Sequence, residues 1–277
     1  MPRERRDSPE QDPIQQSLDT LERSVAAIQD SETFRAYLTA QGRFHQYSFS
    51  NVLLILAQKP DATRVAGYRA WQSMDRHVLK GEKAIRILAP LRKKETDEKT
   101  GEENYRVFGF RAASVFDVSQ TDGEPLPEVS VPVLAGEEGK PLWDRMKVVA
   151  EEEGYQVIKG NLTSPTMMGY TSPQERLIMV KKDIPQIQRT KTLAHELGHV
   201  FARHGESNPS TETEAEGIAY VVLAKYGLDS GERSFPYVAT WAKDKNTLRA
   251  ALGQIQRVSQ TIIGRLEPEA EAETAAP

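Results

Sequence analysis

Residues 188–203 read QRTKTLAHELGHVFAR, and this stretch decides the class of the C-terminal half of the chain. We expect a single helix here, because apolar residues on both sides of HELGH would bury it. His195 and His199 are four residues apart, so both imidazoles lie on one helix face and can bind one metal ion. Glu196 lies one residue round the helix, where it can serve as general base toward a metal-activated water. Because HExxH also arises by chance, the downstream sequence has to support this interpretation.

A second predicted helix, over Glu212–Tyr226, offers the third metal ligand. A glutamate from a later helix usually completes this class of site, and Glu212 follows His199 by thirteen residues. Glu216, one turn later, is suited to accept the ring N–H of a ligand histidine. Two alternatives stay open: Glu216 is the ligand instead, or Glu212 only favours the start of an acidic, solvated helix.

The absence of cysteine from all 277 residues leaves histidine and carboxylate as the available metal ligands. Such ligands with an open water position are typical of catalytic zinc more than of structural zinc. We therefore assign zinc to His195, His199 and Glu212, with Glu196 as catalytic residue. Glu216 is assigned as the hydrogen-bond acceptor for the ring N–H of a ligand histidine.

Other side chains near the motif have less certain roles. His204 follows the HELGH helix, where an imidazole near the C-terminus is electrostatically favoured, and a role in the site stays open. Tyr170, Tyr220 and Tyr237 are candidates for stabilising a developing oxyanion, and the sequence does not choose among them.

The charge of the chain is unevenly distributed. There are 36 Lys and Arg against 40 Asp and Glu, a net charge of −4. Residues 34–94 hold 12 Lys and Arg but three Asp and Glu, a net +9, which leaves −13 for the rest. Of the 20 aromatic residues, 11 lie between Phe34 and Phe116. Cations that follow phosphates and rings that stack on unpaired bases suit single-stranded nucleic acid. The alternative is an ordinary basic surface around an aromatic core.

Local patterns predict two halves separated by a Pro- and Gly-rich stretch around 121–140. In the first half they predict helices over Ile14–Ile28, from Ser31, from Ser50 to before Pro60 and around Trp71, and strands at Ala84–Leu88 and Tyr105–Val118. In the second half they predict helices at Leu142–Glu153, Gln188–Arg203, Glu212–Tyr226 and Asn246–Leu266, and strands at Tyr155–Ile158 and Arg176–Lys181.

The first half resembles a known family. Residues 47–90, YSFSNVLLILAQKPDATRVAGYRAWQSMDRHVLKGEKAIRILAP, and residues 110–123, FRAASVFDVSQTDG, look like the N-terminal domain of antirestriction proteins of the ArdC type. In that family this domain binds single-stranded DNA and a zinc-dependent metallopeptidase-like domain follows it. HELGH and ETEAE occupy the corresponding positions here, and the second half is also similar to the ImmA/IrrE metallopeptidases. The resemblance covers roughly residues 34–265.

The composition and the resemblance together imply an α+β protein of two domains. We expect a disordered lead at 1–12, a basic α+β single-stranded-DNA-binding domain at 13–120, a linker at 121–140, a mainly helical zincin-like metallopeptidase domain with a small sheet at 141–266, and an acidic disordered tail at 267–277. The candidate DNA-binding residues are Arg43, Tyr47, Asn51, Arg69, Trp71, Arg76, Lys80 and Lys83.

Three functions compete at this point. In the first, the protein binds single-stranded DNA and hydrolyses a peptide bond of an unidentified protein or peptide by zinc-activated water. In the second, it only coats and protects DNA, and the zinc has a structural role. In the third, it is an ImmA-like peptidase that cleaves a regulatory repressor and uses the basic half for recruitment.

The sequence also predicts where the protein works. The first residues, MPRERRDSPEQ, lack the apolar segment of a secretory signal. The longest apolar run, Val52–Ala57, is far shorter than the roughly 18 residues of a membrane span. We therefore expect a cytoplasmic protein with no membrane partner.

Overall fold

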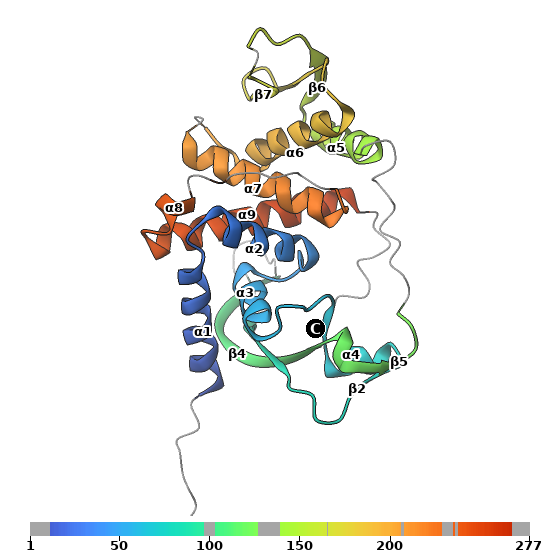
Figure 1. The fold of residues 1–277 in the computed structure, drawn as a ribbon, viewed down its shortest axis with the longest axis vertical. Helices are drawn as coiled ribbons and strands as arrows, with labels where there is room; N and C mark the ends of the chain where they lie inside the picture. The colour runs from blue at the N-terminus through green and yellow to red at the C-terminus, as the bar shows by residue number, and fades with distance from the viewer. Residues whose placement is uncertain are drawn as a thin grey trace, which may run out of the picture. The chain divides into compact units, whose positions relative to one another are not determined.

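The computed structural model describes residues 12–96, 103–126, 139–164, 166–205, 208–228, 235 and 238–267. These residues form two compact units, one made by 12–25 with 53–126 and the other by 26–52 with 139–267. Both helices and strands are present, so the predicted α+β class is confirmed (Figure 1). Residues 1–11, 127–138 and 268–277, which include most of the predicted lead, linker and tail, lie outside the described residues, as does Tyr237.

The first unit is built on a long antiparallel hairpin. Strand β4 (Glu103–Asp117) pairs with β3 (Ile85–Thr96) along its length and with the short β1 (Val65–Gly67) at its end, in the order β1-β4-β3. A second small sheet pairs β2 (Arg76–Val78) with β5 (Thr121–Gly123). The unit also contains most of α1 (Pro13–Ala27), the end of α3 (Phe49–Gln58), α4 (Tyr68–Ser73) and the short 3-10 helix η1 (Val118–Gln120).

Two residues from the stretches 47–90 and 110–123, Trp71 and Asp117, stabilise this unit from its interior. Trp71 is fully buried and its Nε1 donates a hydrogen bond to the carbonyl of Phe116, 2.9 Å away. Asp117 is buried too, and its carboxylate accepts hydrogen bonds from the backbone N–H groups of Thr63, Arg64 and Ser119. Burial by itself raises the pKa of Asp117, but these hydrogen bonds outweigh it and leave the pKa below its usual value.

The second unit surrounds the HELGH helix. Helix α6 (Gln186–Ala202) lies between a three-stranded sheet and helix α7 (Pro209–Lys225), and it also contacts α5 (Lys140–Glu152) and α9 (Lys245–Leu266) (Figure 1). The sheet has the order β6-β8-β7. Strand β8 (Leu177–Lys181) pairs in parallel with β6 (Gln156–Gly160) and antiparallel with the edge strand β7 (Gly169–Ser172).

An N-terminal helix packs into this second unit. Helix α2 (Ser31–Arg43) contacts α7 and the short α8 (Val238–Trp241). Gly42 permits the close approach, since a Cβ there would lie 3.0 Å from the carbonyl oxygen of Val221. The Phe34 ring meets Phe235 and Trp241 edge-on, with centroids 5.0 and 6.1 Å apart. The predicted domain 13–120 is thus divided between the two units, because the apolar face of α2 is buried against helices that come much later in the chain.

Helix starts differ from the predicted ones by a few residues. Ser31 is a plausible helix cap by its residue type, but Asp30 caps α2, because the Asp30 side chain accepts hydrogen bonds from the backbone N–H groups of Glu32 and Thr33. Asn208 caps α7 in the same manner, so this helix starts at Pro209 and Glu212 falls in its first turn. None of the described helices is long and apolar enough to cross a membrane.

Candidate metal centre

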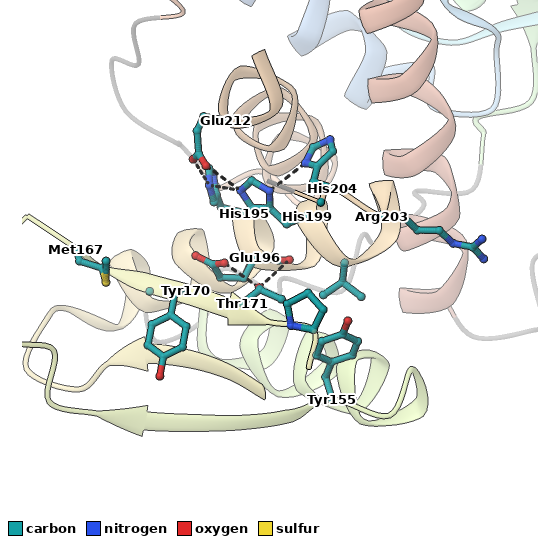
Figure 2. A pocket seen from close by; sticks show the side chains of 14 residues that line it. Tyr155, Met167, Tyr170, Thr171, His195, Glu196, His199, Arg203, His204 and Glu212 are labelled. Carbon is teal, nitrogen blue, oxygen red and sulfur yellow. Dashed lines mark hydrogen bonds and ion pairs between the residues drawn. The ribbon is translucent and has the colours of Figure 1, made fainter. Parts of the chain in front are cut away.

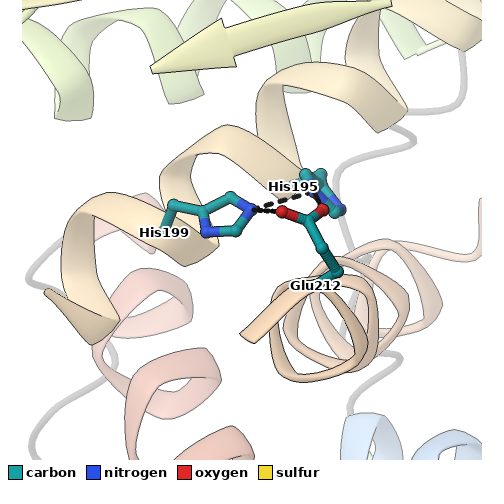
Figure 3. Close-up of side chains that lie close together, drawn as sticks. All are labelled: His195, His199 and Glu212. Atoms are coloured by element: carbon teal, nitrogen blue, oxygen red, sulfur yellow. Dashed lines mark hydrogen bonds and ion pairs between the residues drawn. The ribbon is translucent and has the colours of Figure 1, made fainter. Parts of the chain in front are cut away.

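Helices α6 and α7 bring three possible metal ligands together. The Nε2 atoms of His195 and His199 lie 3.1 Å apart, and those two atoms lie 3.2 and 3.6 Å from the nearer oxygens of Glu212 (Figure 3). Zinc bonds of 2.0–2.1 Å in tetrahedral geometry place ligand atoms about 3.3 Å apart. The donor set and its spacing therefore fit one zinc-sized divalent ion held by His195, His199 and Glu212.

The surroundings of His199 favour its neutral, metal-binding form, and those of His195 orient its ring. Burial, with a smaller contribution from the neighbouring His195, lowers the pKa of His199 to about 4 against the opposing effect of Glu212. The Nδ1 of His195 lies 3.1 Å from an oxygen of Glu216, which orients the ring so that Nε2 faces His199 and Glu212. Glu212 thus faces both histidines, and Glu216 lies behind His195.

Glu196 lies on the sheet side of α6. Its side chain is buried, and Oε2 accepts a hydrogen bond of 2.9 Å from the Thr171 hydroxyl on β7 (Figure 2). Burial raises the pKa of Glu196 above its usual value, although His195 and the Thr171 hydroxyl oppose that shift. Gly169 lets β7 come this close, because a Cβ there would lie 2.6 Å from Thr192 Cγ2 and 3.2 Å from Glu196 Oε1.

A cleft of about 610 Å³ opens beside these groups. Its lining includes the three candidate ligands, Glu196 and, from outside α6 and α7, Tyr155, Tyr170 and Thr171 (Figure 2). Of the candidate tyrosines, Tyr170 therefore lines the cleft, whereas the Tyr220 hydroxyl lies 3.2 Å from Thr39 Oγ1 on α2. Thr171 and Tyr155 were not singled out from the sequence, because Tyr155 only begins a predicted strand and Thr171 lies outside the predicted elements.

The candidate DNA-binding residues of the second unit lie around the end of α2 and the start of α3. Arg43 is exposed, whereas Tyr47 and Asn51 are half-buried. The Tyr47 ring meets Phe44 edge-on at 6.4 Å, and burial raises the pKa of its hydroxyl. Of these three residues, Arg43 is the one that is exposed to solvent.

The candidates of the first unit fall into two groups. Arg69, Lys80 and Lys83 are exposed. Trp71 is buried in the core, so no base can stack on its ring in this structure. The Arg76 guanidinium donates hydrogen bonds to Thr121 and to the carbonyls of Gly123 and Glu124, which gives it a structural role in joining β2 and β5.

The β3–β4 hairpin exposes rings that the candidate set does not include. Tyr105 is 68% exposed, Phe108 65% and Phe110 53%. The register pairs Tyr105 with Lys94, Val107 with Arg92 and Phe110 with Pro90, so these six residues share one face of the hairpin. Their position in the basic, aromatic half was visible in the sequence, but their exposure was not.

Comparison with known families gives two matches, which follow each other along the chain. Residues 13–116 match the N-terminal domain of the anti-restriction factor ArdC. Residues 150–228 match the IrrE N-terminal-like domain of the M78 peptidase family. The first match includes residues 26–52, which pack in the second unit.

Individual relatives are more distant. An uncharacterized protein of Bacillus anthracis is 27% identical over 263 residues, which cover 79% of this chain and 44% of that protein, so the chain spans less than half of it. Two crystal structures of the antirestriction protein ArdC from plasmid R388 are 20% identical to the chain. The metal-free structure has a TM-score of 0.48, and the match covers 78% of this chain and 84% of the ArdC chain. The Mn(II)-bound structure has a TM-score of 0.44, with 84% and 98% covered. An ArdC N-terminal domain followed by an IrrE-like domain on one chain makes this protein a member of the ArdC type.

Proposed function

We propose that this is an antirestriction-like protein that binds single-stranded DNA and carries a divalent-metal-dependent peptidase centre. The observation that carries the peptidase part is the buried Glu196 carboxylate beside the three candidate ligands, in a cleft large enough for a peptide segment. The ArdC and IrrE-like domain matches support the same combination.

The peptidase chemistry follows from what the side chains can do. A divalent cation held by His195, His199 and Glu212 would supply Lewis acidity, polarising a carbonyl and lowering the pKa of water in the cleft. Thr171 holds Glu196 through Oε2, which leaves Oε1 to accept a proton from the attacking water. The raised pKa of Glu196 makes it a better base and lets it pass that proton to the leaving amine. Zinc is the proposed ion, because two imidazoles and one carboxylate are among its preferred ligands.

Exposed rings next to cations support the DNA-binding part. Tyr105 and Phe110 on β4 share one face of the hairpin with Lys94 and Arg92 on β3. Rings of this kind stack on unpaired bases while cations neutralise phosphates. Residues 95–104, which include the ends of both strands and the segment between them, hold five Asp and Glu against one Lys, so the cations of the hairpin lie in the other parts of its strands. We propose these four residues as DNA contacts, together with the exposed Arg69, Lys80 and Lys83 of the first unit.

The two parts can be tested separately with one conservative variant. Glu196→Gln keeps the shape of the side chain and its bond from Thr171 but removes the base. We expect native protein loaded with zinc to cleave members of a peptide library, read by mass spectrometry, and the variant to lose that cleavage at equal metal content. A zinc-loaded native protein that cleaves nothing and still protects DNA would favour the binding-only alternative. Disappearance of one cellular protein with native chain but not with the variant would favour the repressor-cleaving alternative.

DNA binding is tested by fluorescence anisotropy with labelled oligo-dT over a range of salt. We expect affinity to fall steeply as salt rises, because bound counterions are released. The Tyr105→Ala/Phe110→Ala double variant should weaken binding by about 2–6 kcal/mol, since each stacked base contributes about 1–3 kcal/mol. Tyr68→Ala, at an exposed ring on α4, is the matched control. Equal affinity of double variant and control would remove the hairpin from the DNA surface, and absence of binding at low salt would refute DNA binding itself.

A further inference from the structure

His204 makes contacts that the proposed chemistry does not use. Its Nδ1 lies 2.9 Å from Nδ1 of His199 (Figure 2). Its Nε2 lies 3.1 Å from an oxygen of Glu214. The His204 side chain is 7% exposed and that of Glu214 is 19% exposed, so water competes weakly for these bonds. Both ring nitrogens of His204 are occupied, which leaves neither as a metal ligand.

The backbone after α6 turns His204 back onto the helix. Arg203 caps α6 in the left-handed conformation, with φ +54° and ψ +42°, which is unusual for a residue with a side chain. The turn is closed by hydrogen bonds from the Arg203 N–H to the Val200 carbonyl and from the His204 N–H to the His199 carbonyl. Because of this turn, an imidazole that follows the helix in sequence lies against the ring of His199, with centroids 5.0 Å apart.

One assignment of the ring protons satisfies the contacts from His199 through His204 to Glu214. If Nε2 of His199 keeps its lone pair toward His195 and Glu212, its proton is on Nδ1 and donates to Nδ1 of His204. His204 then carries its own proton on Nε2 and donates it to the Glu214 carboxylate. Each of these two imidazole protons then has an acceptor.

We infer that His204 and Glu214 are positioning residues that hold His199 in the tautomer and ring orientation required of a metal ligand. His195 receives the same support directly from Glu216, so the two ligand histidines are oriented by different means, one by a carboxylate and one by a carboxylate acting through an imidazole. Groups that orient a ligand imidazole typically contribute 10- to 100-fold to metal affinity. This inference rests on the metal centre of the proposed function, but its central claim concerns the protein before any metal is added.

The tautomer of His199 is read directly by long-range ¹H–¹⁵N NMR of the metal-free protein. The chain has five histidines, so single substitutions assign the ring signals. We expect the native His199 ring to carry its proton on Nδ1. In His204→Ala the His199 signal should change to a mixture of tautomers while the His195 signal stays unchanged. His204→Asn, which offers an amide oxygen near the former Nδ1, should restore the native His199 signal in part.

Metal affinity gives the second readout, measured by competition of zinc with a chromophoric chelator. His204→Ala should lower affinity about 10- to 100-fold, and Glu214→Gln and His204→Asn should lower it less. His77→Ala and Glu151→Gln, at exposed positions, are the matched controls and should bind zinc like the native protein. Circular dichroism of each metal-free variant identifies any that fails to fold.

The outcomes separate the inference from the function on which it rests. A native His199 proton on Nε2, or a His204→Ala variant with unchanged His199 signal and unchanged zinc affinity, would overturn the positioning role. A native protein with the expected tautomer that binds no zinc would instead refute the metal centre. If His204→Ala does not fold, the native spectrum and the Glu214→Gln variant still decide the question.

Discussion

Gly198, the fourth residue of HELGH, lies where α6 meets α7, and its replacement by alanine measures how tightly that contact holds the metal centre. A Cβ atom at this position would lie 3.2 Å from both Cα and the carbonyl oxygen of Ala215 and 3.5 Å from Ala215 Cβ. The nearest atoms belong to the backbone of α7, so the helices have to separate by a few tenths of an ångström. Glu212 lies on α7 one turn before Ala215, and it would move away from the two histidines with that backbone.

The magnitude follows from two opposing contributions. Alanine favours a helix over glycine by about 0.8–1 kcal/mol, whereas overpacking a well-packed contact costs about 1–3 kcal/mol. Gly264→Ala is the matched control, because Gly264 is an exposed residue of α9 whose added Cβ would meet nothing within 4 Å. The helix-propensity contribution is nearly common to both, so Gly198→Ala should be less stable than Gly264→Ala by about 1–3 kcal/mol.

Urea unfolding of both metal-free variants measures this difference, and zinc titration measures its effect on the site. We expect Gly264→Ala to match or slightly exceed the native stability and to bind zinc normally. Gly198→Ala should lose about tenfold in zinc affinity, which corresponds to about 1.4 kcal/mol. If both variants are equally stable and bind zinc alike, the α6–α7 contact does not control the position of Glu212 and the reasoning fails.

Three further predictions concern other parts of the molecule. Burial and the nearby Lys225 lower the pKa of His45 from 6.5 to about 4 against the opposing effect of Glu267, so the fold favours the neutral ring. The contribution of this ring to the free energy of unfolding should be fully present above pH 6.5 and fall by about 3 kcal/mol as the pH drops to 4. Urea unfolding of a His45→Gln variant should not show this loss. Asp117→Asn replaces one of the two oxygens that accept backbone N–H groups by an NH2 donor, so it should destabilise the first unit by about 1–3 kcal/mol in thermal or urea unfolding. Asp122→Asn, at an exposed strand residue, should not have this effect. At a free zinc concentration of 100 times the dissociation constant, removal of the zinc by a chelator should lower the free energy of unfolding by about 2.7 kcal/mol. His195→Ala should show no response to zinc or chelator in scanning fluorimetry.

The sequence determined the parts of the site that lie on one helix. His195 and His199 share a face of α6 because they are four residues apart, and Glu196 points elsewhere because it is one residue round. The same short-range rule places Glu216 one turn after Glu212 on α7. The order of the two matched domains also follows from sequence motifs alone.

Other roles depended on burial, which composition does not reveal. Trp71 lies in a basic, aromatic segment that suggests stacking on bases, yet its ring is in the core of the first unit. Tyr105 and Phe110 come from the same segment and are exposed on the hairpin. A ring buried beneath a sheet and a ring exposed on one have the same local sequence pattern, so only the packing of the whole unit distinguishes them.

Contacts between distant segments were decided by the tertiary structure. Thr171 reaches Glu196 because β7 packs on α6, and Glu214 orients His199 only through His204, which a left-handed turn at Arg203 brings back. Helix α2 packs on α7 although nearly the whole first unit separates them in the chain. Helical periodicity acts over a few residues and therefore determines which side chains share a face. Which distant side chain meets that face depends on how all the apolar surfaces are buried together, and that is a property of the folded chain.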